Sequence, residues 1–309
     1  MTNILVTGGA GNIGASLVNR LVRNPDFYVV VSDNLLTGSA DKLPGPEFSN
    51  WKFIKSDVND YRDISAIMLA HNFDYVFHYA AVVGVQRTLS NPKMVLDDIE
   101  GIKNVLNLSK NTGVRRVFFS SSSEVYGEPV EIPQYEDTTP LNSRLPYAIV
   151  KNVGEAFFKS YHQEYGLDYT IFRFFNTYGP RQSTDFVISK FIERAVTGKD
   201  ITIYGNGLQT RTFCYIEDNL DTIERILTTG VCKNDVINIG SDEEIAILDL
   251  AYKIKTVFNS PSEIVHLDPL KEGDMTRRKP DITKMIEILG RPLISLDEGI
   301  RKTHEYRMF

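Results

Sequence analysis

A glycine-rich turn close to the N-terminus restricts the fold of this chain more than any other feature. Gly8, Gly11 and Gly14 follow an apolar stretch at residues 3–6 and precede an amphipathic stretch at residues 15–23. The apolar stretch predicts a buried strand, and the amphipathic stretch predicts a helix. Glycines at such a junction allow a tight turn and let a pyrophosphate approach the backbone at the helix N-terminus. The pattern therefore predicts the first strand–helix unit of a dinucleotide-binding sheet.

An acidic residue marks the end of the second expected strand, at residues 28–31. Asp33 lies 19 residues after Gly14, which is near the spacing at which a carboxylate binds the ribose hydroxyls of a dinucleotide. A carboxylate at that place disfavours the extra phosphate of NADP, so we expect NAD as the cofactor. A tight loop without a ligand explains the glycines alone. It does not explain a strand, glycines, a helix, a strand and an acid in that order.

Apolar strands and helical segments alternate along the rest of the first half. We expect strands at residues 51–55, 75–81 and 117–119, and helices at residues 64–70 and 92–112. This alternation predicts an α/β fold with a parallel, doubly wound sheet of the Rossmann type, whose ligands bind at the carboxyl ends of the strands. The residues expected to bind the cofactor at that edge are Gly8, Gly11, Asn12, Ile13, Gly14, Asp33, Asn34, Asp57, Val58, Ala80 and Ala81.

Two residues near this edge have competing interpretations. Asp57 follows the third expected strand, where a carboxylate can approach the adenine or, equally, cap the helix that comes next. His78 stands among apolar neighbours in the fourth expected strand, which favours a core histidine over a catalytic one.

A serine cluster and a tyrosine–lysine pair follow the fifth expected strand. Ser122 belongs to a run of four serines, and Tyr147 and Lys151 are four residues apart, so the pair lies on one face of a helix. An ammonium beside a tyrosine lowers its pKa from about 10, which makes the phenol a better proton acceptor near neutral pH. The hydroxyl of Ser122 can bind the same substrate oxygen. On its own, the pair is better explained by an aromatic ring packed beside a lysine stem. The preceding cofactor motif reverses this preference and favours the catalytic interpretation, with Lys151 and Tyr147 also contacting the cofactor.

Charge and cysteine content narrow the functional classes. The net charge of −6 gives no support to nucleic-acid binding, which usually needs a basic surface. The two cysteines, Cys214 and Cys232, suggest neither a disulfide framework nor a metal site, and they fit a reducing cytoplasm. No apolar run reaches transmembrane length and no signal-peptide pattern precedes the first strand, so we expect a cytoplasmic protein without a membrane partner.

The second half of the chain is less regular. A sixth strand is expected at residues 169–174, and a helix at 215–228 and a strand at 236–239 are expected to return to the first domain. We therefore expect residues 1–177, with a returning segment at about 212–240, to form the cofactor domain. Residues 178–309 are expected to form most of a smaller, interleaved α/β domain that binds the substrate.

With these residues assembled, the chain resembles the extended short-chain dehydrogenase/reductases that modify nucleotide sugars. Its T-G-G-A-G-N-I-G turn matches theirs, with Asn12 where an aromatic residue is more usual. Ser122, Tyr147 and Lys151 fall at the catalytic positions of that family. Segments at residues 173–181, 209–211 and 277–281 resemble its substrate-binding segments.

The resemblance implies a substrate and an assembly. Asn176, Arg211 and Arg278 match residues that hold the sugar diphosphate, and an arginine fork suits a phosphate bidentately. The substrate is then a nucleoside-diphosphate sugar with UDP, dTDP or GDP. Related proteins pair through the helix that carries the tyrosine and lysine and through the helix at residues 92–112, which implies a homodimer. The aromatic face of the first helix, formed by Phe157, Phe158, Tyr161 and Tyr165, fits such an interface and equally fits packing inside one chain.

The reaction implied by the resemblance begins with oxidation of a sugar hydroxyl, usually at carbon 4, by bound NAD. Dehydratases of the family carry an Asp-Glu pair after the catalytic Ser or Thr, whereas this chain has Ser123 and Glu124. We therefore rank dehydration low and expect a 4-epimerase or a 4-dehydrogenase. Glu124 is a catalytic candidate, and a structural acid in the loop is equally compatible with the sequence.

Two other functions remain open. UDP-glucuronate decarboxylases share the Ser-Glu pair and the segment at residues 277–282, but their Tyr-Asp-Glu-Gly-Lys helix is changed between Tyr147 and Lys151, and Asp98 replaces their Asn. An added acid is unfavourable for a sugar that carries a carboxylate, provided that Asp98 faces the site. A non-catalytic dinucleotide-binding regulator is the other rival, and such a protein is expected to lose the Tyr or the Lys, which are both present.

Overall fold

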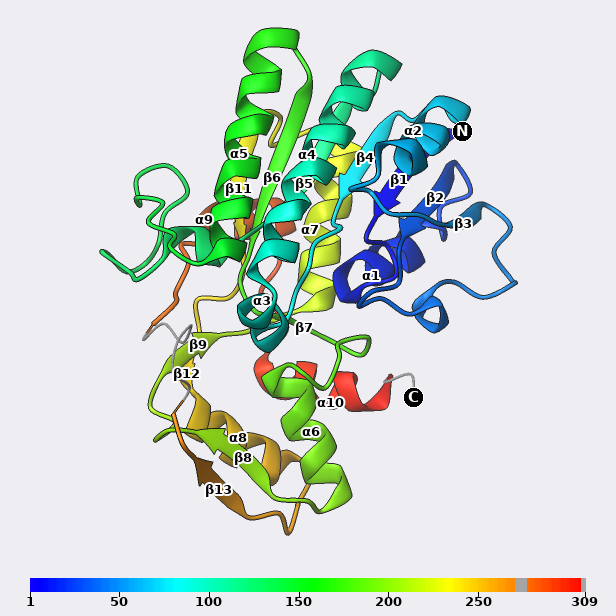
Figure 1. The fold of residues 1–309 in the computed structure, drawn as a ribbon. Helices are drawn as coiled ribbons and strands as arrows, with labels where there is room; N and C mark the ends of the chain where they lie inside the picture. The colour runs from blue at the N-terminus through cyan, green and yellow to red at the C-terminus, as the bar shows by residue number, and fades with distance from the viewer. Residues whose placement is uncertain (270–276, 307–309) are drawn as a thin grey trace. The chain divides into compact units, whose positions relative to one another are not determined.

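A seven-stranded sheet is the centre of the fold in the computed structural model, which describes residues 1–269 and 277–306 (Figure 1). Its strand order is β11-β6-β5-β4-β1-β2-β3, and the pairs of β1 with β2 and β4, of β2 with β3, and of β4 with β5 are parallel. The strands are β1 (Thr2–Thr7), β2 (Phe27–Asp33), β3 (Trp51–Lys55), β4 (Tyr75–His78), β5 (Arg116–Ser122), β6 (Asp168–Phe174) and β11 (Asp235–Ile239). The expected Rossmann-type α/β fold is confirmed.

Helices bury both faces of this sheet, which explains why its strands read as continuous apolar runs. One hydrophobic cluster joins alternate strand residues, such as Leu5 and Phe119, to the helices on that face. The intervening residues Ile4 and Phe118 are also fully buried, as a period of two requires when both faces are covered. The long helices of the sheet are α1 (Asn12–Leu21), α2 (Tyr61–Ala70), α4 (Pro92–Thr112), α5 (Pro146–Tyr165) and α7 (Ile216–Thr229).

A glycine lets α5 lie close against the sheet and its neighbouring helix. A Cβ atom at Gly154 would lie 2.5 Å from the ring of Phe119 on β5 and 3.1 Å from the Ile102 side chain on α4. Figure 1 shows α4 and α5 side by side, and contacts between the two helices agree with this view. The close approach holds the helix of Tyr147 and Lys151 against the strand that ends in the serine cluster.

The chain divides into two compact units, each described separately. The first contains Met1–Val125, Ser143–Arg173 and Ile223–Ile237, and the second contains Tyr126–Asn142, Phe174–Thr222 and the described part of Asn238–Phe309. The chain thus passes between the units several times. We retain the expected boundary at residues 177 and 178 as a prediction.

Short paired strands and helices build the second unit. The strand pairs are β7 (Thr177–Tyr178) with β10 (Cys214–Tyr215), β9 (Thr210–Thr212) with β12 (Glu244–Ala246), and β8 (Ile201–Tyr204) with β13 (Ile264–Leu267). Its helices are α6 (Val187–Thr197), α8 (Ile247–Val257), α9 (Thr283–Leu289) and α10 (Leu296–Glu305). The remaining short elements of the chain are α3 (Val85–Ser90), η1 (Ala40–Lys42) and η2 (Ser123–Tyr126).

Two expected boundaries were wrong near the glycine turn. The first helix begins at Asn12 rather than residue 15, because Gly11 is already its extended N-cap residue. The fourth strand ends at His78 rather than residue 81. Tyr79 still donates its backbone N–H to the Thr7 carbonyl, and the chain then leaves the sheet. Ala80 and Ala81 therefore lie in the loop beyond the strand end.

Candidate functional site

Three consecutive serines at the end of β5 contact three different groups. Lys151 Nζ donates to Ser120 Oγ over 3.4 Å, and Ser121 Oγ donates to Glu155 Oε1 over 2.6 Å. Ser122 Oγ accepts the backbone N–H of Glu124 at 3.2 Å. Because Ser122 is the acceptor in that bond, its own hydroxyl hydrogen can be donated to a substrate oxygen.

The tyrosine and lysine lie on α5, as the four-residue spacing predicted. Lys151 is buried, and its Nζ lies 5.7 Å from the centre of the Tyr147 ring and 5.0 Å from that of Phe119. Burial lowers the pKa of Lys151 to about 8, and the negative charge of Asp98 opposes that shift. The amine is thus poised to change its charge close to physiological pH, as groups in reaction sites often do.

A buried ion pair supports this helix one turn further along. Arg173 on β6 binds Glu155 through Nε at 2.9 Å and Nη2 at 2.7 Å, and both residues are 1% exposed. Arg173 begins the segment that resembles a substrate-binding strand, yet its guanidinium is held by a structural partner. Sequence reasoning missed Glu155, although its place one turn after Lys151 puts it on the same inward face of α5.

Glu124 lies in η2, two residues after Ser122. Its backbone N–H donates to Ser122 Oγ, so the residue shapes the loop around that serine. Its side chain is half-buried. A catalytic role for the carboxylate stays a prediction beside the structural one.

The glycine turn has the geometry that a dinucleotide needs. Gly8 has φ +67°, and a Cβ there would lie 2.5 Å from the backbone nitrogen of Ala80. A Cβ at Gly14 would collide with the Gly8 carbonyl oxygen. Gly11 is the N-cap residue of α1 and has no side chain. The backbone N–H groups of the first helical turn, which have no partner inside the helix, are therefore accessible to a bound anion. Asn12 and Ile13, both half-buried, form that first turn.

Asp33 fixes the turn from the end of β2. Its Oδ2 accepts the backbone N–H of Ala10 at 2.9 Å, and its Oδ1 accepts that of Leu35 at 2.8 Å. A carboxylate has about four acceptor sites, so these two bonds leave acceptor capacity for ribose hydroxyls. Asp33 therefore both shapes the loop and remains the expected ribose ligand.

The residues after β3 form a second polar loop at the same edge. Asn34 Nδ2 donates to Asp57 Oδ2 at 3.1 Å, and Asp57 Oδ1 accepts the N–H of Asn59 at 2.9 Å. The helix cap is Asp60, which accepts the N–H of Arg62, so capping does not explain Asp57. Val58 packs its side chain into the hydrophobic cluster, which leaves only its backbone for a cofactor.

His78 is a core residue, as its neighbours suggested. Its Nδ1 lies 2.8 Å from Thr7 Oγ1, and its ring stacks on Phe119. Burial, and then the charge of Lys151, lower the pKa of His78 to about 3. The imidazole is neutral at physiological pH and fastens β4 to β1.

Asp98 on α4 is buried on the Lys151 side of the unit. It accepts the backbone N–H of Val82 at 2.8 Å and Asn59 Nδ2 at 3.3 Å. Burial raises the pKa of Asp98, while these bonds and the charge of Lys151 lower it. That Asp98 faces the substrate stays a prediction.

The residues expected to bind the substrate gather in the second unit. Asn176 has φ +29°, and its Nδ2 donates to the Thr212 carbonyl at 2.9 Å. Arg211 is buried on β9, and its Nη1 donates to the Thr210 carbonyl at 2.7 Å. Arg278 is buried as well, whereas its exposed neighbour Arg277 pairs with Glu244.

Glu244 links the two arginine segments. It also accepts the Thr210 hydroxyl at 3.1 Å, and β12, which begins with Glu244, pairs with β9. One acidic side chain thus holds the segment before Arg278 against the strand of Arg211. The second unit brings the two expected diphosphate ligands onto connected segments.

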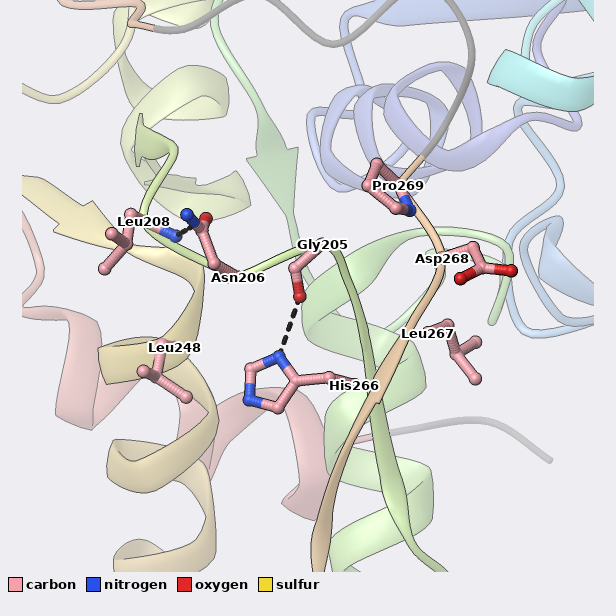
Figure 2. A pocket seen from close by; sticks show the side chains of 8 residues that line it. All are labelled: Gly205, Asn206, Leu208, Leu248, His266, Leu267, Asp268 and Pro269. Atoms are coloured by element: carbon pink, nitrogen blue, oxygen red, sulfur yellow. Dashed lines mark hydrogen bonds between the residues drawn. The ribbon is translucent and has the colours of Figure 1, made fainter.

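A hollow in the second unit is lined by other residues (Figure 2). His266 Nδ1 contacts the Gly205 carbonyl oxygen at 2.7 Å across it, and Leu208 N–H bonds to Asn206 Oδ1 at 3.0 Å. The lining residues are Gly205, Asn206, Leu208, Leu248, His266, Leu267, Asp268 and Pro269. None of the expected site residues lines it.

Comparison with known proteins decides the family. Residues 4–240 match the model of the NAD dependent epimerase/dehydratase family. The chain belongs to this family. Its glycine turn and its serine, tyrosine and lysine cluster all lie inside the matched residues.

Relatives of this family member differ in their reactions. The chain is 36% identical to UDP-glucuronic acid decarboxylase 5 of Arabidopsis thaliana, over 96% of this chain and 86% of the relative. A UDP-glucose 4-epimerase of Thermotoga maritima, solved with UDP-glucose, superposes with a TM-score of 0.92 at 34% identity, covering 99% of this chain and 98% of that one. The chain is therefore an NAD-dependent enzyme of the nucleotide-sugar epimerase/dehydratase type.

NAD is the cofactor of this family, and the residues present fit it. The UDP-glucose 4-epimerase of Thermus thermophilus, solved with NAD, has a TM-score of 0.90 to this chain at 28% identity, with 99% and 98% of the two chains covered. In the present chain, a side chain at Gly8 or Gly14 would fill the glycine turn. The two glycines keep the space inside the turn open, and the carboxylate of Asp33 is hydrogen-bonded to the same turn.

None of the helices at residues 1–269 and 277–306 is long and apolar enough to cross a membrane. In the same residues, no group of three or more histidine, cysteine, aspartate or glutamate side chains is arranged to hold a metal ion.

Proposed function

We propose that this enzyme oxidises the carbon-4 hydroxyl of a nucleoside-diphosphate sugar, and that it acts as a 4-epimerase. The observation that carries the proposal is the group of Ser122, Tyr147 and the buried Lys151 around the end of β5. A 4-dehydrogenase uses the same three residues and differs only in releasing the ketone.

Each side chain has one task in this reaction. Tyr147 takes the proton of the carbon-4 hydroxyl, and Ser122 donates a hydrogen bond to the same oxygen. The ammonium of Lys151 favours the phenolate of Tyr147 by its positive charge. NAD supplies the acceptor for the hydride. In an epimerase, the ketosugar then presents its opposite face, the hydride returns to carbon 4, and Tyr147 gives the proton back to the oxygen.

The second unit supplies the proposed diphosphate site. Arg211 and Arg278 are both buried, and buried guanidinium groups bind phosphate with little competition from water. Asn176 holds the Thr212 carbonyl and offers its side-chain oxygen to the substrate. UDP is the favoured nucleotide because the similar decarboxylase and the Thermotoga epimerase are named for UDP-sugars.

UDP-glucuronate decarboxylation is the second candidate. The 36% identity to a plant decarboxylase supports it, as does the Arg-Arg-Lys-Pro-Asp-Ile segment that ends at Ile282. Asp98 stands where these decarboxylases carry Asn, and an added negative charge facing the site would disfavour a sugar that carries a carboxylate. Epimerisation needs no such carboxylate.

The exposed faces of α4 and α5 and the two cysteines bear on assembly and location. Tyr165 and Ile149 on α5, and Leu96 on α4, are exposed apolar side chains on the two helices through which related enzymes pair. We therefore propose a homodimer through these helices. Two free cysteines, Cys214 and Cys232, fit a cytoplasmic enzyme.

The test is product analysis with a panel of sugars. Purified enzyme is incubated with UDP-glucose, UDP-N-acetylglucosamine, UDP-glucuronate, dTDP-glucose and GDP-mannose, and products are resolved by mass spectrometry and chromatography. An isomer without net NADH supports the epimerase, and a product two hydrogens lighter with NADH identifies the dehydrogenase. Loss of carbon dioxide from UDP-glucuronate would replace the proposal by the decarboxylase. Tyr147→Phe is the matched inactive control.

A further inference from the structure

We propose that Asn238 is a positioning residue for the diphosphate site, because it fastens the segment of Arg278 to the segment of Asn176. The inference rests on the proposed function, which makes Arg278 and Asn176 ligands of the diphosphate. Asn238 lies near the carboxyl end of β11 and is fully buried. It therefore acts on the substrate through those two residues, and all three belong to the second unit.

The side-chain amide of Asn238 donates and accepts hydrogen bonds at the same time. Its Nδ2 donates to the Gln134 carbonyl at 2.9 Å and to the Asp281 carbonyl at 3.2 Å. Its Oδ1 accepts the Tyr126 hydroxyl at 2.8 Å, and its backbone N–H donates to Glu136 Oε1 at 2.9 Å. An amide supplies two N–H donors beside an acceptor oxygen, and this position uses both donors and the acceptor.

These bonds hold the segment that follows Arg278. The Gln134 N–H donates to the Lys279 carbonyl at 2.8 Å, and the Asp281 N–H donates to the Gln134 carbonyl at 2.9 Å. The two backbone bonds form a short parallel bridge. Because Asn238 binds the Gln134 and Asp281 carbonyls, it fixes this bridge to β11. Arg278 is buried one residue before the bridge begins, so its backbone is held at that end.

Gly240, two residues beyond this amide, lies between the two ligand segments. A Cβ there would lie 2.8 Å from Pro280 Cγ and 3.0 Å from Phe175 Cβ. The Phe175 N–H also donates to the carbonyl of the residue before Gly240 at 2.8 Å. Phe175 directly precedes Asn176. Pro280 lies two residues after Arg278, so this stretch of chain sets the spacing between the two expected ligands.

Diphosphate binding is sensitive to that spacing. A guanidinium binds phosphate oxygens through a planar fork, which requires a defined direction of approach. A displacement of about 1 Å in a substrate-positioning group can cost about 100-fold in rate. Asn238 therefore contributes to substrate affinity by fixing the backbone from which Arg278 and Asn176 extend.

Two substitutions disturb this arrangement in different ways. Asn238→Leu keeps a side chain of similar size and removes its three hydrogen bonds. Gly240→Ala keeps those bonds and pushes Pro280 and Phe175 apart, because the new Cβ would come within 2.8 Å and 3.0 Å of them. The φ angle of Gly240 lies outside the left-handed region, so the strain in this variant comes from the contact alone.

Gln134→Leu is the matched control. Gln134 is fully buried beside the same segment, and its side-chain nitrogen and oxygen have no hydrogen-bond partner among the described residues. Its contribution to the bridge comes from its backbone, which the substitution keeps. The control therefore removes a buried amide without removing a hydrogen bond.

The experiment measures the Kd of UDP by isothermal titration calorimetry on NAD-saturated enzyme, and the Kd of NAD in a separate titration. We expect Asn238→Leu and Gly240→Ala each to raise the Kd of UDP about tenfold, and Gln134→Leu to leave it unchanged. The Kd of NAD should not change, because the expected cofactor residues belong to the first unit. Lower stability alone would not change the Kd of protein that remains folded. KM for the sugar nucleotide should rise in parallel, with kcat close to wild type.

A Kd for UDP close to that of wild type, in either Asn238→Leu or Gly240→Ala, would overturn the inference for a variant that folds. An equal loss of affinity in Gln134→Leu would overturn it as well. Failure of both Asn238→Leu and Gly240→Ala to fold would also overturn it, because this stretch would then serve the fold. A wild-type enzyme that binds NAD but none of UDP, dTDP and GDP would contradict the proposed function, on which the inference depends.

Discussion

Two buried cations lie along the inward side of α5, and they are bound in contrasting ways. Arg173 binds Glu155 through two short hydrogen bonds, with both partners 1% exposed. Lys151 is 3% exposed and donates one long bond of 3.4 Å to Ser120, and the charge of Asp98 opposes the lowering of its pKa by burial. The charge of Arg173 is neutralised by a carboxylate in direct contact, and the pair stabilises the fold. Among the residues that the structure describes, no carboxylate is hydrogen-bonded to Lys151, so its pKa responds to its surroundings, as is common in reaction sites.

The largest expected effect comes from breaking the ion pair of Arg173 and Glu155. Arg173→Met leaves Glu155 buried without its partner, and removal of one member of a buried ion pair costs about 3–5 kcal/mol of stability. Chemical denaturation measures the change in the free energy of unfolding. Lys93→Met, which removes an exposed cation paired with Asp97, is the control and should unfold close to wild type. A loss as small as that of the control would show that the Arg173 pair contributes no more than a surface one.

Lys151 should behave in the opposite way. The pKa of Lys151 falls from 10.5 to about 8 on folding, so its burial costs stability at pH 7. Lys151→Met should therefore raise the free energy of unfolding by about 2 kcal/mol at pH 7 while abolishing turnover.

The stability difference between Lys151→Met and the wild-type protein should depend on pH. Between pH 8 and 10.5, the unfolded chain retains a proton that the folded protein has lost, so wild-type stability rises with pH across that window. The advantage of Lys151→Met should shrink over the same range in urea unfolding. A variant less stable than wild type at pH 7 would contradict the contrast with Arg173.

His78 extends the comparison to a buried side chain that stays neutral. Its pKa falls from 6.5 to about 3 on folding, so below pH 6.5 the unfolded chain binds a proton that the folded protein does not. Stability is lost as the pH falls through this range, by roughly 2 kcal/mol near pH 5. His78→Asn should reduce this acid sensitivity, and identical acid unfolding of the two proteins would show that His78 is not buried in its neutral form.

The smallest expected effect concerns a third buried cation, in the second unit. Arg211→Lys keeps the charge but loses the planar fork that suits a diphosphate. We expect KM for the nucleotide sugar to rise about tenfold with kcat little changed. Arg277→Lys, at an exposed arginine already paired with Glu244, is the comparison. Equal KM values for both variants would remove Arg211 from the proposed site.

Local patterns predicted one of the two cations. The sequence predicted Lys151 because Tyr147 lies four residues before it and because the glycines of the turn recur at fixed short intervals. The parallel sheet followed from alternating strands and helices for the same reason. Asp33 was also found by its spacing from Gly14, and the structure adds that it holds the turn through the Ala10 N–H.

The rest depends on contacts between distant segments. The pairing of Arg173 with Glu155 joins a strand to a helix, and the sequence placed Arg173 in a substrate segment instead. The bonds of Asp98 to Val82 and Asn59 join three elements, so no local pattern announces its burial. Likewise, nothing in the sequence of Tyr126–Asn142 shows that this segment belongs with the second unit.

The most direct test of the central claim follows the hydrogen at carbon 4. A UDP-sugar deuterated at that carbon, and turned over by the wild-type enzyme, is compared with the unlabelled sugar in single-turnover reactions, with Tyr147→Phe as the inactive control. Oxidation at carbon 4 predicts slower turnover of the deuterated sugar, with the deuterium back at carbon 4 of the isomerised product. Equal rates together with a product formed by loss of hydrogen from another carbon would contradict it.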